Sequence, residues 1–184
     1  MSLAVVFSRA GGLDAPLVTV EILLTNGLPA LNMVGLPETA VKESKDRVRG
    51  AILNSQFEFP LRRITINLAP ADLPKEGGRF DLAIAMGILL ASNQIGIDER
   101  QQKELLETFE FVGELALSGE IRAVKSILPI AIQANKNNRI LIVPEANGQE
   151  AALIQGLKVY TAKHLLDVCA FLKGEQILGK PEAQ

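Results

Sequence analysis

The 184-residue sequence is poor in the residue types that mark several classes of protein. Its single cysteine, Cys169, excludes an internal disulfide framework and a cysteine-rich metal site. Cys169 lies in the apolar stretch LLDVCAFL, which predicts a buried, small hydrophobic side chain. Tryptophan is absent and tyrosine occurs once, so Leu, Ile, Val and Ala must supply most of the core.

Signals for export and for membrane insertion are also missing. The N-terminus has no basic region followed by an apolar stretch and a small-residue cleavage site. The longest apolar run, residues 82–91, is too short to span a bilayer. We therefore expect a cytoplasmic protein with no membrane partner.

The sequence lacks the common catalytic signatures. No G-x-x-x-x-G-K-[ST] motif is present to cradle nucleotide phosphates. The only histidine, His164, falls in the pattern of the last helix, and neither a metal-ligand spacing nor a G-x-S-x-G motif accompanies it. We expect no enzymatic activity, cofactor or metal in this chain by itself.

The net charge of the chain is −2, so the overall positive charge typical of many nucleic-acid-binding domains is absent. Any nucleic-acid contact would need a local basic face. Hydrophobic residues make up 48% of the chain and charged residues 22%, which is typical of a globular domain with a substantial core.

The first part of the chain reads as strands followed by a helix. Residues 3–8 and 17–24 are rich in β-branched residues, and 28–35 follows the Asn26-Gly27 turn signal. Three early strands in a hairpin or meander are predicted. Residues 38–53 place apolar and small residues at three- and four-residue spacing, which predicts an amphipathic helix.

The remainder alternates between the two patterns. Further strands are predicted at residues 62–69, 109–117, 121–124, 139–144 and 157–162. Helices are predicted at residues 80–92, 97–108, 125–135 and 163–173, the first apolar on all sides and therefore buried. This order predicts an α/β (α+β) domain whose sheet is largely covered by helices.

Two capping boxes are predicted at helix starts. Asp98 is followed three residues later by Gln101, and Asn147 by Glu150. The second box would open a short helix that Gly156 ends.

Several segments, in order, resemble the N-terminal domain of the ComM/YifB family of Mg-chelatase-like AAA+ proteins. They are VGLPETAVKESKDRVRGAILNS, ITINLAPADLPKEGGRFDLAIAMGILLAS, GELALSGEIRAVKSILPIA and LIVPEANGQEAAL. The resemblance implies a ribosomal protein S5 domain 2-like fold, shared with the Lon protease domain and the RadA C-terminal domain. It also implies a domain at residues 1–174 and a linker at 175–184 leading toward an AAA+ ATPase module.

The resemblance also implies a function. Characterised family members are hexameric DNA motors that promote branch migration during natural transformation, with ATP and Mg²⁺ used by the full-length protein. This domain would then be a non-catalytic part that aids ring assembly and contacts DNA. The alternative is an oligomerisation or protein-interaction module that never touches DNA, which the net charge of −2 slightly favours. Magnesium insertion into a porphyrin, the literal sense of the older family label, has no matching site in this sequence.

The turn PKEGG raises a protease alternative. A Lon protease places its catalytic Ser shortly after a similar turn and takes a Lys from a later helix as the base. The resemblance aligns the Ser position with Asp81 and the Lys position with the neighbourhood of Leu128, with Lys125 one turn away. Neither member of the dyad is present, so we expect no peptidase activity.

The same turn also has features that suit anion binding. Lys75 and Arg79 flank Gly77 and Gly78 just before a helix, where free backbone amides attract anions. DNA phosphate or a neighbouring subunit would be the partner. The alternative is a plain strand-to-helix connection, in which Asp81 caps the helix or pairs with Arg79.

The helix at residues 38–53 is the second candidate for DNA contact. Its cations suit phosphate binding without sequence readout; they are Lys42, Lys45, Arg47 and Arg49. Acidic residues lie between them, so a solvated face with i,i+4 ion pairs is the alternative. No aromatic residue interleaves with the cations, which argues against a base-stacking platform.

Overall fold

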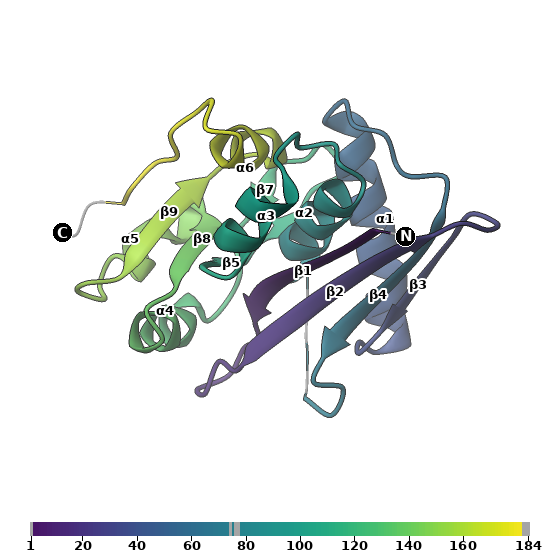
Figure 1. The fold of residues 1–184 in the computed structure, drawn as a ribbon. Helices are drawn as coiled ribbons and strands as arrows, with labels where there is room; N and C mark the ends of the chain where they lie inside the picture. Colours follow the sequence, from purple (N-terminus) through teal and green to yellow (C-terminus); the bar gives the residue numbers. More distant parts are fainter. Residues whose placement is uncertain (1, 74, 76–77, 182–184) are drawn as a thin grey trace.

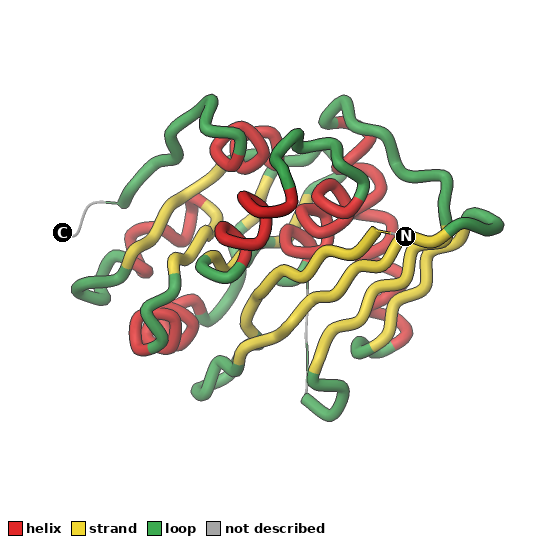
Figure 2. Tube along the Cα trace, viewed as in Figure 1, coloured by secondary structure: helices red, strands yellow, loops and turns green. Residues whose placement is uncertain are grey.

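A seven-stranded mixed sheet organises the computed structural model, which describes residues 2–73, 75 and 78–181 (Figure 1). The strand order is β3-β4-β2-β1-β5-β8-β9. The strands are β1 (Ser2–Arg9), β2 (Leu17–Thr25), β3 (Ala30–Val34), β4 (Arg63–Ala69), β5 (Phe109–Phe111), β8 (Ile140–Pro144) and β9 (Lys158–Ala162). The chain contains both helices (red in Figure 2) and strands (yellow), and helices connect several of the strands. The predicted α/β class is therefore confirmed.

The early strands depart from the predicted meander. β1 and β2 form the expected antiparallel hairpin, but β3 pairs in parallel with β4, from Ala30↔Arg63 to Val34↔Asn67. β4 itself occupies the free edge of β2. The prediction of β3 beside β2 is therefore wrong. The helix between β3 and β4 provides the long crossover that a parallel pair requires.

Six α-helices and a short 3₁₀-helix are present in the described residues. They are α1 (Glu38–Asn54), α2 (Asp81–Ala91), α3 (Glu99–Leu106), α4 (Ile127–Lys136), the 3₁₀-helix η1 (Glu145–Asn147), α5 (Gly148–Ala151) and α6 (Leu165–Leu172). The capping box predicted at Asp98 is confirmed: the Gln101 amide donates to Asp98 Oδ1 at 2.7 Å, and the Asp98 amide donates to Gln101 Oε1 at 3.3 Å.

The strand predicted at 109–117 is two strands. β5 ends at Phe111, and β6 (Glu114–Leu115) pairs with β7 (Ile121–Arg122) in a separate antiparallel ribbon. The break falls at Gly113, whose N–H donates to the Arg79 carbonyl and whose carbonyl accepts from the Leu82 N–H. The chain leaves the main sheet there because its backbone bonds to the start of α2. The short return strand predicted at 121–124 is confirmed as β7.

The larger core is built around α2. Every residue from Asp81 to Ala91 is buried, as the apolar pattern predicted, and the helix packs against β1 and β2. Gly87 permits this close approach, because a Cβ at that position would lie 2.0 Å from Ile22 Cδ1. A second apolar cluster joins α4 and α5 to Leu141 and Val143 of β8, while Ile142 belongs to the first cluster. Since strand side chains alternate, helices cover both faces of this half of the sheet.

The chain after α6 returns to the sheet. Leu178 is buried, and the Thr161 N–H donates to the Gly179 carbonyl at 2.8 Å beside the edge strand β9. The segment predicted as a linker thus contacts the sheet as far as Gly179. The domain boundary at residue 174 stays a prediction.

Candidate functional site

Asp81 is the centre of a buried polar cluster at the start of α2. Its Oδ2 accepts from Arg47 Nε at 2.6 Å and from the Leu115 N–H at 3.1 Å, and its Oδ1 accepts from Ser44 Oγ at 2.8 Å. The cluster joins α1, α2 and β6. Asp81 pairs with Arg47, so the predicted pairing with Arg79 is wrong, and its carboxylate makes no capping bond at the helix start.

Burial of the Asp81 carboxylate is the main influence on its pKa. Only 1% of the Asp81 side chain and 22% of the Arg47 side chain are exposed. Burial raises the pKa of Asp81 above its ordinary 3.8, and the bonds from Arg47, Ser44 and the Leu115 amide offset part of that rise. The bond to Asp81 raises the pKa of Arg47. The arrangement suits a structural ion pair that fixes α1 against α2.

The position aligned with the protease base lies elsewhere in the fold. Leu128 is in the first turn of α4, which packs on the opposite face of the sheet from α2. Lys125 is exposed. The hydroxyl that meets Asp81 belongs to Ser44, which is 3% exposed and donates its hydrogen bond to the carboxylate. The cluster therefore has the chemistry of a structural pair rather than of a nucleophile with its base.

In the PKEGG turn, the Lys75 side chain is directed inward. Its Nζ donates to the carbonyl oxygens of Pro70 and Leu73, and burial lowers its pKa. Gly78 lies close to the Glu114 side chain, which would have to shift to make room for a Cβ, 2.5 Å from its Oε1. Gly77 lies outside the described residues. The Arg79 guanidinium lies against Gly11, 3.1 Å from the place of a Cβ.

The cations of α1 divide into two groups. Arg47 faces Asp81, whereas Lys42 and Arg49 are exposed and Lys45 is partly exposed. Because i,i+3 and i,i+4 residues share a helix face, the last three form one stripe. The Arg49 guanidinium lies 5.2 Å from the centroid of the Phe59 ring. Sequence reasoning missed this aromatic partner, which comes from the loop after α1.

Sequence reasoning also missed a second buried ion cluster, between β1 and β5. Glu110, with no exposed surface, accepts from Arg9 Nε at 2.6 Å and from Arg139 Nε at 3.2 Å. Arg139 also lies 4.7 Å from the centroid of the Phe7 ring. The only sign of this cluster in the sequence is that Glu110 stands between two phenylalanines, in the triplet FEF. The Arg9–Glu110 ion pair links β1 to β5, the two neighbouring strands where the first four strands of the sheet meet the last three.

The capping box predicted at Asn147 and Glu150 is wrong. The Asn147 side chain instead bonds both backbone groups of Val124, with Oδ1 accepting from its N–H and Nδ2 donating to its carbonyl, each at 2.9 Å. Glu150 Oε1 accepts from the Leu128 N–H at 3.1 Å, at the start of α4. Both side chains serve the connection into α4, because that segment leaves backbone groups unpaired near them.

His164 precedes the last helix rather than lying within it. It is the N-cap of α6, where its Nδ1 accepts from the Leu166 N–H at 3.1 Å. Its Nε2 lies 3.0 Å from the Ser118 carbonyl oxygen. Cys169 is buried as predicted, and burial raises the pKa of its thiol to about 12.

The described residues contain neither a metal-binding cluster nor a membrane-spanning helix. No group of three or more His, Cys, Asp or Glu side chains in that part of the chain could hold a metal ion. No helix in the same part is both long and apolar enough to cross a membrane.

The chain is similar to known proteins over nearly its whole length. It is 53% identical over 179 residues to the Competence protein ComM of Haemophilus influenzae, which covers 97% of this chain and 34% of that protein. It is 52% identical over 185 residues to the Uncharacterized protein YifB of Salmonella typhimurium, which covers 100% of this chain and 35% of that protein. The chain thus spans about a third of the length of these relatives.

A family model agrees with these relatives. The model described as subunit ChlI of Mg-chelatase matches residues 20–147, from β2 to the end of η1. The match includes the Asp81 cluster, the PKEGG turn and the cations of α1. Because the matched segment exceeds half of the chain, the chain belongs to the family of subunit ChlI of Mg-chelatase.

Proposed function

We propose that this chain is a non-catalytic N-terminal part of a ComM-like AAA+ ring ATPase, and that it contacts DNA phosphates without reading sequence. The observation that carries the proposal is the 53% identity to the Competence protein ComM, which extends over 97% of this chain. In this proposal ATP and Mg²⁺ act in the part of the protein beyond this chain. The ring is a hexamer, and the DNA-remodelling work is branch migration.

The surface proposed to meet DNA is the exposed stripe of α1, formed by Lys42, Lys45 and Arg49. Flexible cations on a helix surface suit phosphate oxygens and carry no sequence information. The contact of Arg49 with Phe59 restrains one of the three side chains at 5.2 Å from the ring centroid. The Arg47–Asp81 pair supports the stripe from below, because it fixes α1 on α2.

Arg47 and Lys75 are assigned supporting roles in this proposal. Both direct their charge to partners within the chain, Asp81 for Arg47 and two backbone carbonyls for Lys75. Arg79 stays a candidate contact beside the turn. Removing Arg47 would therefore weaken DNA binding by loosening α1 rather than by deleting a phosphate contact.

The acidic residues of α1 limit what one copy can achieve. Glu38, Glu43 and Asp46 lie on the same helix, and Glu43 comes within 3.8 Å of Arg47. A single domain with three available cations should bind weakly. Several copies held in a ring would engage one DNA molecule together and raise the overall affinity. Ring assembly and DNA contact thus depend on each other in this proposal.

A second candidate is an interaction module for other protein chains. Two exposed leucines favour it: Leu53, at the end of α1, is 47% exposed, and Leu117, in the β6–β7 turn, is 58% exposed. Leu117 packs against Gly50 on the same helix. An apolar contact here would suit a neighbouring subunit, and the net charge of −2 does not oppose it.

The test is a titration of labelled single- and double-stranded DNA with the 184-residue chain at low and moderate salt. The variant Lys42→Gln, Lys45→Gln, Arg49→Gln should weaken binding by about tenfold or more. The matched control replaces three exposed lysines elsewhere, Lys125, Lys136 and Lys158, by Gln. Equal losses in both variants would contradict a specific surface on α1. Undetectable DNA binding by an assembled, oligomeric sample would favour the interaction module.

A further inference from the structure

The strand β1 has one edge that is only partly paired. β1 pairs with β2 along its length, from Ser2↔Leu24 to Arg9↔Leu17. On the other side it meets β5 at a single residue pair, Phe7↔Glu110. Backbone groups of a strand point alternately to its two sides, so every second residue in 2–6 directs its N–H and C=O away from β2. Within the described ranges, β5 pairs only with Phe7 of β1, and no backbone group of a turn or loop bonds to residues 2–6 from that side.

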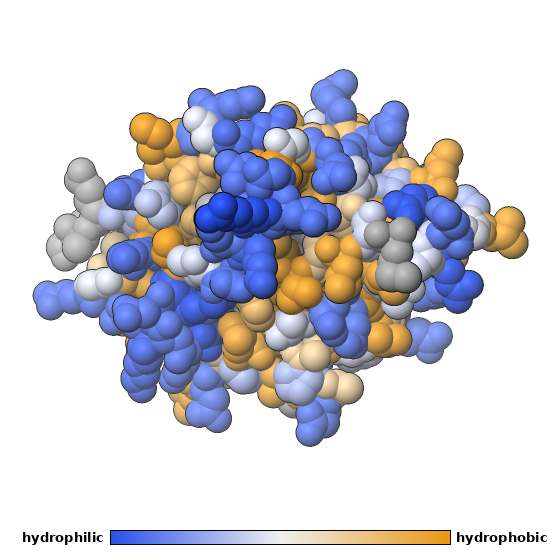
Figure 3. Space-filling view, viewed as in Figure 1, coloured by the Kyte–Doolittle hydropathy of each residue, from blue (hydrophilic) through white to orange (hydrophobic). Residues whose placement is uncertain are grey.

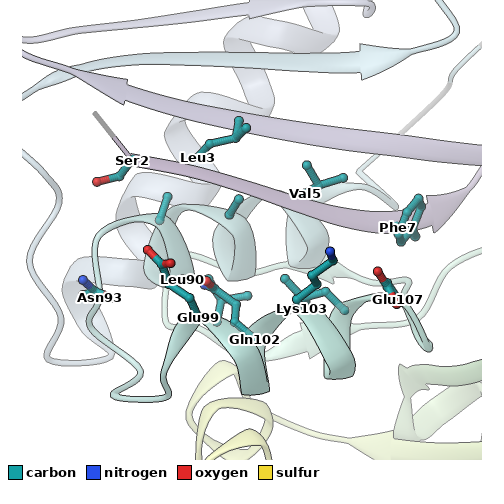
Figure 4. A pocket seen from close by; sticks show the side chains of 13 residues that line it. Ser2, Leu3, Val5, Phe7, Leu90, Asn93, Glu99, Gln102, Lys103 and Glu107 are labelled. Carbon is teal, nitrogen blue, oxygen red and sulfur yellow. The ribbon is translucent and has the colours of Figure 1, made fainter.

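The space beside this edge is a groove. β5 begins at Phe109 and runs parallel to β1, but the chain just before it forms α3 instead of a longer strand. Between β1 and α3 lies a groove of about 580 Å³ (Figure 4). Leu90 and Ala91 of α2 contribute apolar lining. The groove thus occupies the place where β5 would extend.

The exposed edge lacks the usual protection against strand addition. Natural edges are commonly guarded by proline, by charged side chains, by bulges or by a covering helix, and here the groove separates α3 from much of the edge. The stretch SLAVV at residues 2–6 contains no proline and no charge, and its register with β2 is unbroken. Leu3 is 59% exposed beside the groove. The backbone chemistry of this edge is complementary to another extended backbone.

We propose that this groove binds an extended peptide segment of a partner protein, which adds as a strand beside β1 and carries basic side chains. Main-chain hydrogen bonds to residues 2–6 would supply the pairing, as in other cases of strand addition. At about 3.3 Å per residue, the free edge accommodates a segment of about four or five residues.

The lining of the groove selects the side chains of such a peptide. Alternate side chains would face the apolar lining, which suits small apolar residues such as Ala or Val. The side chains between them would face the α3 wall, where Glu99, Lys103 and Glu107 lie (Figure 4). None of these three makes an ion pair within the described part of the chain. The wall carries one excess negative charge, so Lys or Arg in the peptide is favoured.

The probe is an acetylated, amidated hexapeptide of sequence AKVKVA, titrated into the ¹⁵N-labelled 184-residue chain. Two control peptides separate backbone pairing from charge: the same sequence with N-methyl groups on alternate residues, and AEVEVA. The measurements are amide chemical shifts and amide hydrogen exchange at residues 2–6. Spectral dispersion of each variant shows that it remains folded.

We expect AKVKVA to shift these amides at about millimolar concentration and to slow exchange at alternate positions. The N-methylated peptide should not bind. The double variant Glu99→Gln, Glu107→Gln should weaken binding about fivefold. The matched control Glu104→Gln, on α3 but outside the groove, should leave the affinity unchanged.

Three results would overturn the proposal. One is equal binding of the N-methylated peptide, because that would exclude strand pairing. Another is an equal loss of peptide affinity in Glu104→Gln, because the loss would then reflect the net charge of the protein and not the charges beside the groove. The third is an absence of shifts at residues 2–6 in the folded chain, with any exchange protection there rising with protein concentration instead. That last result would assign the edge to a second copy of this chain.

Discussion

The Arg47 guanidinium and the Asp81 carboxylate meet across 34 residues of chain, with Nε 2.6 Å from Oδ2. One residue lies in the middle of α1 and the other begins α2. Ser44 and the Leu115 amide complete the shell of donors around the carboxylate. This contact fixes α1, and with it the exposed cationic stripe proposed to meet DNA.

Removing Arg47 should destabilise the fold in a pH-dependent way. Arg47→Met leaves the Asp81 charge buried without its main partner, which should cost about 3 kcal/mol of unfolding free energy at neutral pH. The loss should shrink as the pH falls, since Asp81 then takes up a proton. Urea unfolding at several pH values measures this. The control is Arg49→Met, on the exposed face of the same helix, which should change the free energy of unfolding little. A loss of unfolding free energy in Arg47→Met that does not vary with pH would contradict the role of the buried Asp81 charge.

The titration of Asp81 itself should be shifted upward. Burial raises the pKa of this carboxyl in the folded chain above 3.8. The contribution of this group to stability is therefore fully present below 3.8 and is lost as the pH rises through the folded pKa. Carboxyl ¹³C NMR gives the folded value directly. Ser44→Ala should raise it further, because the Ser44 bond favours the charged form; a folded pKa at or below 3.8 would be inconsistent with dominant desolvation.

Asn147 should be important for stability rather than for helix capping. Asn147→Ala leaves the N–H and the carbonyl of Val124 without partners, which should cost about 2 kcal/mol. Asn147→Asp keeps the acceptor for the Val124 N–H but loses the donor to its carbonyl, so a similar loss is expected. Thermal or urea unfolding tests both. If Asn147→Ala were neutral, water would have replaced the side chain and the bonding role would be minor.

Cys169 should be unreactive in the folded protein. Its side chain is 3% exposed, and burial raises the pKa of the thiol to about 12. A thiol in this state offers almost no thiolate near neutral pH. A chromogenic disulfide reagent should therefore leave the native chain unmodified and label it fully in concentrated urea. Rapid labelling without denaturant would show that α6 opens readily.

Local patterns predicted the elements whose causes are local. The buried helix α2 follows from an apolar run, and the capping box at Asp98 and Gln101 follows from a three-residue spacing. The same spacing failed at Asn147, because its side chain has a tertiary partner, Val124. The predicted meander puts β3 beside β2, because the true partner of β3, β4, comes only after α1 in the chain.

In the candidate site, too, sequence patterns identified the charged residues but not their tertiary partners. Arg47 and Arg49 are alike in sequence, two residues apart on one helix. Their roles differ because Asp81 lies near the first and Phe59 near the second, and both partners come from later segments. Likewise, nothing near Glu110 in the sequence indicates Arg9, which is 101 residues away. Three-dimensional packing decides which charges face the solvent, and only exposed charges can meet DNA phosphates.

The salt dependence of DNA binding tests the central claim most directly. Each phosphate contact to duplex DNA contributes about −0.9 to the slope of log K against log salt concentration. If the α1 stripe binds DNA, the Lys42→Gln, Lys45→Gln, Arg49→Gln variant should have a slope shallower by about 2 to 3 than the unmodified chain. The Lys125, Lys136 and Lys158 control should retain the original slope. Identical slopes for the stripe variant and the unmodified chain would contradict the account and leave a protein-interaction surface as the better explanation of α1.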